Sequence, residues 1–205
     1  PTRRSSDQYI LANLDQPLPL GDVAKHAGVG VGTVYRRFAS KDELIQALFD
    51  TRCSEIETIA ATAREMPDAW EGLVYFLDVI SLRMADNRGF GDLLMDGRVT
   101  SDTFARARAG IARHTAVLVN RAKEQGTLRS DFEVNDIPLL MQVVKMAQKF
   151  GGDEAPQAYR RALGFMIDGL CASRTDHREL PVPALSSEQL DHVLHRFQAT
   201  PGKNC

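Results

Sequence analysis

Several classes of protein are disfavoured by what this sequence lacks. Its three cysteines, Cys53, Cys171 and Cys205, are odd in number and far apart, so we expect reduced thiols rather than a disulfide framework or a zinc site. No apolar run reaches the ~18 residues that a membrane-spanning helix needs, and nothing near the start resembles a signal peptide. These absences favour a cytoplasmic protein without a membrane segment.

Catalytic motifs are also missing. The sequence contains no HExxH, CxxC or GxSxG pattern, and such motifs place metal ligands or nucleophiles at fixed spacing. Asp168 and Cys171 share one face of an expected helix, but neither belongs to a catalytic motif in the sequence. We therefore expect no enzymatic activity, no metal and no cofactor.

Positive charge is concentrated near the start of a chain whose net charge is only −2. Residues 1–41 hold six basic and three acidic side chains, a net of +3, whereas the remaining residues hold 19 basic and 24 acidic ones, a net of −5. A small basic head on an acidic body favours local phosphate binding without general attraction to polyanions.

Apolar residues recur at helical spacing through most of the chain, and no segment alternates convincingly as a strand would. The pattern predicts an all-α fold. Expected helices begin at Lys41 and after Asp68, and continue with Asp102 to near Gly126, Asp136–Phe150, Pro156–Arg174 and a last helix capped by Ser187. Pro67 and the 175–187 segment, with its two prolines, are expected to be breaks.

The stretch GVGVGTVYRRF, residues 28–38, permits two interpretations. Three alternate glycines suggest a phosphate-binding turn, but a dinucleotide-binding turn requires a strand before the glycines. The preceding LGDVAKHA has apolar residues three and four apart, which is typical of a helix. Burying Asp22, Lys25 and His26 in a strand would leave polar groups unpaired. This stretch is therefore better explained as part of a helix-turn-helix.

Each position of the stretch has a role in that motif. Ala24 is small enough for the second helix to cross closely, and Gly28 tolerates the positive φ of the turn. Val29 is expected to turn inward, and Val34 and Phe38 to bury the second helix against the first. The residues left facing outward are Val31, Gly32, Thr33, Tyr35, Arg36 and Arg37.

The segment GDVAKHAGVGVGTVYRRFASKDELIQALF, residues 21–49, resembles the DNA-binding signature of TetR-type transcriptional regulators. A weaker likeness is carried by GTLRSDFEVNDIPLLM, which is similar to the stretch entering the eighth helix of many relatives. The resemblance implies a three-helix DNA-binding head, residues 1–45, on a helical ligand-binding and dimerisation domain, residues 46–205. It further implies a homodimeric repressor that a small-molecule effector releases from a pseudo-palindromic operator in double-stranded DNA.

Within such a head, Val31–Arg37 would be the recognition helix in the major groove. Thr33 and Tyr35 suit phosphate contacts, which fix position without reading sequence. Arg36 and Arg37 can bind phosphate or a guanine edge, although the same pair taken alone is also typical of a solvated helix face. Gly32 allows close approach of the backbone, and Lys41 can add a phosphate contact beside the first amides of the next helix.

The body offers candidates for two further sites. Aromatic, methionine and other apolar residues, with one histidine, could line an effector pocket, although such residues at helical spacing are more often plain core. They are Trp70, Phe76, Ile80, Phe90, Leu94, Met95, Phe104, His114, Leu118, Met141 and Met146. The resemblance places dimerisation on the last two large helices, with Leu140, Val144, Ala147, Leu163, Met166, Ile167 and Leu170 as seam candidates.

The alternative to a DNA-binding regulator is a helical small-molecule-binding module without specific DNA binding.

Overall fold

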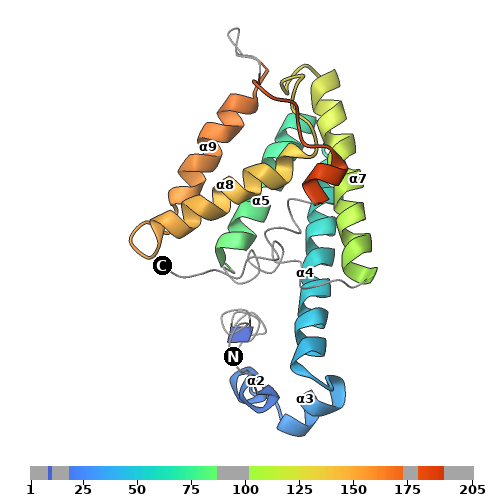
Figure 1. The fold of residues 1–205 in the computed structure, drawn as a ribbon, viewed down its shortest axis with the longest axis vertical. Helices are drawn as coiled ribbons and strands as arrows, with labels where there is room; N and C mark the ends of the chain where they lie inside the picture. Colours follow the sequence, from blue (N-terminus) through green and yellow to red (C-terminus); the bar gives the residue numbers. More distant parts are fainter. Residues whose placement is uncertain (1–8, 11–18, 87–101, 173–179, 192–205) are drawn as a thin grey trace.

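The computed structural model describes residues 9–10, 19–86, 102–172 and 180–191, and these residues are mostly helical (Figure 1). The larger helices are α2 (Leu20–Ala27), α3 (Val31–Arg37), α4 (Lys41–Arg64), α5 (Ala69–Asp86), α7 (Asp102–Glu124), α8 (Asp136–Gly151) and α9 (Ala158–Leu170). Strand pairing in the described part is limited to an isolated bridge between Leu128 and Cys171. The all-α prediction is confirmed.

One long helix connects the two ends of the molecule. Figure 1 shows α2 and α3 beside the first turns of α4, while the rest of α4 runs into a body formed with α5, α7, α8 and α9. α4 packs mainly on α7 and α5, and α8 and α9 pack on each other and on α5. The predicted division between residues 45 and 46 falls inside α4, so head and body share a continuous helix.

Local sequence explains where these helices begin and end. Gly28 has a φ of 67° and a ψ of 28°, the left-handed geometry that glycine adopts without strain, and it ends α2. Asp68 Oδ1 accepts hydrogen bonds from the amides of Trp70 (2.8 Å) and Glu71 (3.0 Å), so it caps α5 as predicted. α7 ends two residues before Gly126, whose φ is 68°.

α4 and α5 pack closely where they meet at the end farthest from the head. A Cβ atom placed on Gly72 would lie 2.5 Å from the carbonyl oxygen of Ala63, so only glycine fits here without movement of the backbone. Arg121 of α7 donates hydrogen bonds to the carbonyl oxygens of Arg64, Met66 (2.9 Å) and Pro67 (3.0 Å). The distal end of α4 is thereby fixed to α7.

The C-terminal part differs from the prediction in two places. α9 spans 158–170, shorter than the expected 156–174, whose last two residues lie outside the described part. The helix that begins at residue 187 is capped by Ser186 rather than Ser187, because Ser186 Oγ accepts from the amide of Gln189 (3.1 Å). Gln189 Oε1 accepts in return from the amide of Ser186 (2.9 Å), which completes a reciprocal cap.

Candidate nucleic-acid interface

The head is a helix-turn-helix whose inner face is apolar. Ala24 is fully buried, as expected for the residue beneath the crossing, and Val34 is buried beside it in the cluster formed with Leu20 and Val23. Phe38 is half-buried against the same cluster. The amide of Val29 donates to the carbonyl of Ala24 (3.0 Å), which fixes the direction in which the chain leaves α2.

The prediction that Val29 turns inward is wrong, because 46% of this residue is exposed. Its amide is used to close the end of α2, and only Gly30 separates it from α3. The space between α2 and α3 is already filled by Val23, Ala24 and Val34, so the side chain remains at the surface.

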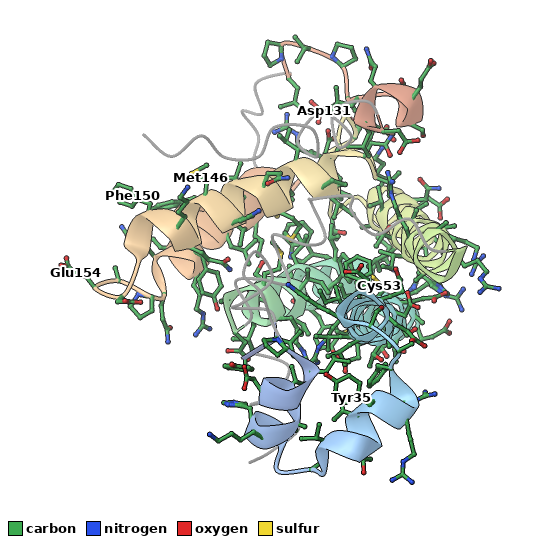
Figure 2. All side chains as sticks on the ribbon, turned by 60° about the horizontal axis from the view of Figure 1, so that its bottom comes forward. Tyr35, Cys53, Asp131, Met146, Phe150 and Glu154 are labelled. Carbon is green, nitrogen blue, oxygen red and sulfur yellow. The ribbon has the colours of Figure 1, made fainter. Side chains whose placement is uncertain are left out.

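All six residues predicted to face outward on α3 are exposed: Val31, Gly32, Thr33, Tyr35, Arg36 and Arg37. The structure therefore gathers them on the free surface of one short helix in the head, where Figure 2 labels Tyr35. The seventh predicted residue, Lys41, is half-buried as the first residue of α4, three positions beyond Phe38.

The two arginines of α3 are held in different ways. Arg36 Nε donates to the carbonyl oxygen of Gly32 (3.2 Å), so its guanidinium group lies along the helix. The Cζ atom of Arg37 lies 5.7 Å from the centre of the Phe38 ring, within the range of a cation–π contact. Both side chains are exposed, and both place positive charge at the head.

The first turn of α4 is capped by its own side chains. Ser40 Oγ accepts from the amide of Glu43 (3.1 Å), and Glu43 Oε2 accepts from the amide of Ala39 (2.6 Å). This reciprocal cap uses one of the amides that the sequence suggested for phosphate binding, and it adds the carboxylates of Asp42 and Glu43 to that turn. A phosphate contact here would depend mainly on the Lys41 ammonium group.

The structure separates the predicted pocket residues. Phe76, Ile80, Leu118 and Met141 are buried, and Trp70 and His114 are half-buried. The placement of Met146 in the pocket is corrected. This residue is 64% exposed and lies on the outer face of α8 (Figure 2), because residues 137, 141, 144 and 148 form the inner face. Phe90, Leu94 and Met95 lie outside the described residues, and so does the side chain of Phe104.

Some buried polar atoms of the body have no hydrogen-bond partner among the described residues. Among them are the hydroxyl oxygen of Ser81 on α5, a residue that is fully buried, and Nδ1 of His114 on α7. Gln148 of α8 is also buried and donates to the carbonyl oxygen of Ser81 (3.1 Å). His114 was anticipated from the sequence, whereas Ser81 and Gln148 were not, because single polar residues are inconspicuous within apolar helical patterns.

The predicted seam residues fall into two groups. Val144, Leu163 and Leu170 are buried within the single chain, so they offer little surface to a second copy. Leu140, Ala147, Met166 and Ile167 are half-buried against the same core. The outer surface of α8 and α9 instead exposes Leu139, Val143, Met146, Phe150 and Phe165. We call these five residues the outer apolar face.

The described residues contain neither a cluster of metal-ligand side chains nor a helix that could span a membrane. Nowhere in this part of the chain do three or more His, Cys, Asp or Glu side chains gather as a metal ion would require. No described helix combines the length and apolar character needed to cross a bilayer.

Comparisons with known proteins agree with this architecture. The family model described as "Transcriptional regulator SbtR-like, C-terminal domain" matches residues 67–172, and that described as "Bacterial regulatory proteins, tetR family" matches residues 17–48. The HTH-type transcriptional regulator SAR0097 of Staphylococcus aureus (strain MRSA252) is 46% identical over 75 residues. That match covers 30% of this chain and 39% of the relative, so less than half of its length is spanned.

Solved structures extend the likeness to most of the chain. The TetR transcription regulatory protein from Mycobacterium vanbaalenii is 26% identical with a TM-score of 0.58, over 82% of this chain and 93% of that one. The transcriptional regulator FadR from Bacillus subtilis, solved in complex with stearoyl-CoA, is 15% identical with a TM-score of 0.58. The match covers 82% of this chain and 98% of the FadR chain, and it shows a likeness of fold alone. Since one family model spans more than half of the chain and a second spans the helix-turn-helix, this protein belongs to the TetR family of transcriptional regulators.

Proposed function

We propose that this protein is a homodimeric transcriptional repressor that binds a pseudo-palindromic operator and leaves it when a small-molecule effector binds the body. The observation that carries the proposal is the exposed surface of α3, which is connected through the single helix α4 to the buried interior of the body. Because its target is chromosomal DNA, we expect the protein to act in the cytoplasm.

The recognition surface supports specific DNA binding. Tyr35 and Thr33 supply hydroxyl groups for phosphate oxygens, and Arg36 and Arg37 supply guanidinium groups for phosphate or guanine. One head with so few contacts binds weakly, so two heads are needed, with recognition helices about 34 Å apart. The seven DNA-contact residues predicted from the sequence, Lys41 included, remain our proposed contacts.

The outer apolar face supports the dimer. Leu139, Val143, Met146 and Phe150 recur four, three and four residues apart, so they form one stripe along α8. Phe165 of α9 is 66% exposed, and the guanidinium group of Arg161 lies over its ring at 5.1 Å. A stripe of large apolar side chains on a helix pair is costly in water, and a second copy covering it through a two-fold axis would remove that cost.

The body supports effector binding through its composition. α4, α5, α7 and α8 surround buried apolar side chains, among which the Ser81 hydroxyl and His114 Nδ1 have no hydrogen-bond partner in the described part of the chain. An unmade hydrogen bond at a buried polar atom costs about 1–3 kcal/mol, so a ligand that pairs with these atoms would gain affinity. We infer a mainly apolar effector with one hydrogen-bonding group. An effector acts only through different affinities for the DNA-competent and incompetent states.

A fluorescence-anisotropy titration with DNA from the protein's own upstream region tests the proposal. It is run at several salt concentrations beside a scrambled duplex and a Tyr35→Ala/Arg36→Ala variant. Nanomolar affinity for the native duplex that falls steeply with salt and is lost in the variant is the expected result. If neither this duplex nor a selection from genomic fragments yields a preferred site, the protein is instead a ligand-binding module without specific DNA binding.

A further inference from the structure

Two valines stand at the entrance to the recognition helix with their side chains in solvent. Val29 lies in the turn and Val31 is the first residue of α3, and they are 46% and 47% exposed. They flank Gly30, and Gly32 follows. A Cβ atom on Gly32 would meet nothing within 4 Å, and one on Gly30 would meet only Thr33 Oγ1 at 3.6 Å. The two valines therefore project from an otherwise bare backbone.

The rest of the motif limits what this surface can read in DNA. Residues 28–38 include no Asn, Gln, Asp or Glu. Asn and Gln are the side chains that bind the adenine edge through two hydrogen bonds, and Asp and Glu accept from the cytosine amino group. The motif retains arginines for guanine, hydroxyl groups that suit several partners, and exposed apolar side chains. The apolar feature of a base pair in the major groove is the 5-methyl group of thymine.

We propose that Val31, assisted by Val29, recognises the methyl group of a thymine in each operator half-site. This inference rests on the proposed DNA binding. The N-terminal end of a recognition helix is the part that approaches the base edges, and Val31 occupies that end. Arg36 and Arg37, at the opposite end of α3, supply the charge that draws the helix to the phosphates. The A·T pair is then selected through its methyl group rather than through its adenine.

Replacing thymine by deoxyuridine isolates this contact, because it removes the methyl group and preserves every hydrogen-bonding group of the pair. Burying one methyl group corresponds to about a four-fold gain in affinity per half-site, and to about fifteen-fold when both half-sites are changed. The converse substitution adds the methyl group to another pair. A 5-methylcytosine·guanine pair at the same position should therefore bind more tightly than an unmodified cytosine·guanine pair.

The experiment uses the full chain and an operator selected from genomic fragments. Each thymine position is changed to deoxyuridine in both half-sites, and dissociation constants are measured by anisotropy at one salt concentration. The affinity of the wild-type protein should fall about fifteen-fold when deoxyuridine replaces thymine at one symmetric position. Val31→Ala should bind the thymine and uracil duplexes equally at that position. Val29→Ala should reduce the ratio of the affinities for the thymine and uracil duplexes by a smaller factor.

Two controls separate methyl recognition from general loss of binding. Tyr35→Ala should weaken binding to both duplexes and keep the thymine-to-uracil ratio, because a phosphate contact is indifferent to the base. Val182→Ala changes an exposed valine of the body and should alter neither value.

The possible failures are distinct. Tight, selective binding with no effect of uracil at any position overturns the methyl contact and leaves the repressor proposal standing. A uracil effect that persists in both valine variants assigns the methyl group to another residue and also overturns it. The absence of any preferred duplex removes both proposals.

Discussion

Phe150 provides a direct test of the proposed dimer, because 90% of this residue is exposed in the single chain. It lies in the last turn of α8, at one end of the outer apolar face (Figure 2). We expect Phe150→Ala to leave the free energy of unfolding of the isolated chain within about 0.5 kcal/mol, since an exposed side chain contributes little to the core. Its effect should appear when two chains associate.

The size of that effect follows from burial and symmetry. Fully burying a phenylalanine side chain contributes about 1.5–3 kcal/mol, and a two-fold interface contains two copies of every residue. Taking the lower value for each copy gives about 3 kcal/mol, which corresponds to a dissociation constant of the dimer raised about 100-fold. Operator binding should weaken as well, because a monomer presents one head.

Sedimentation velocity across a range of protein concentrations measures the dimer constant, and circular dichroism checks that the variant folds. Val117→Ala is a matched control: this exposed valine lies on α7, which Figure 1 shows on the opposite side of the body from α9. It should leave the association unchanged. An unaltered dimer constant for Phe150→Ala, in a folded protein, would show that α8 does not dimerise through this face.

Three further predictions concern the body. Gly72→Ala should lower the free energy of unfolding in urea by about 1–3 kcal/mol, because its Cβ would press on the Ala63 carbonyl. Asp131→Asn should lower the free energy of unfolding, and this loss should shrink as the pH falls. The hydrogen bond from Arg129 lowers the pKa of Asp131 from 3.8 to about 2, so the stabilisation that the carboxylate provides above about pH 4 is lost towards pH 2. Burial, with a smaller effect of Asp50, raises the pKa of Cys53 to about 12, so iodoacetamide at pH 8 should modify this thiol in the unfolded protein and not in the folded one.

Gly72 has a control position within the chain, and each of the other two predictions has an outcome that would refute it. Gly21→Ala, at an α2 position where a Cβ meets nothing within 4 Å, should raise stability by up to about 1 kcal/mol, so equal losses at both glycines would refute the steric argument. For Asp131, a gap between wild type and variant that stays constant from pH 5 to pH 2 would contradict the ion pair. For Cys53, mass spectrometry of the folded protein decides, and alkylation at the unfolded rate would refute its burial.

The helix-turn-helix was predictable because its constraints are local. A small residue at Ala24, a positive φ at Gly28 and burial of Val34 follow from chain geometry within one short segment. Val29 was the exception. Its direction depends on the amide bond that closes α2, and apolar character alone favours burial even where the turn keeps a valine outside.

The outer apolar face could not be distinguished from the inner one because α8 is apolar on both. Leu139, Leu140 and Met141 are consecutive, so helical periodicity admits more than one inward direction. The structure turns Met141 inward and Leu139 outward, and it buries the polar Gln148 that the pattern would have placed at the surface. Packing against α5 and α9 decides the rotation of this helix, and that information lies far away in the sequence.

Contacts made by Arg121 are equally hidden from the sequence, and they fix the end of α4 that lies farthest from the head. Its carbonyl partners lie more than 50 residues earlier in the chain: Arg64 is the last residue of α4, and Met66 and Pro67 follow it. α4 has 24 residues and so is about 36 Å long. A rotation of about 5° around the end held by Arg121 would move Lys41, and the head with it, by about 3 Å. That displacement is close to the ~3.4 Å rise of one base pair.

Arg121 should therefore control how strictly the proposed dimer depends on the distance between the two half-sites of its operator. Wild-type protein, with the distal end of α4 fixed, should lose affinity sharply when one base pair is inserted at the operator centre. Arg121→Ala frees that end and should lose less affinity for the same insertion, while binding the native operator nearly as well. Anisotropy titrations of both proteins against both duplexes measure how many-fold the inserted base pair lowers the affinity of each protein. Identical penalties in a folded Arg121→Ala variant would show that α4 does not pivot on this contact, and that the spacing of the heads is set elsewhere in the dimer.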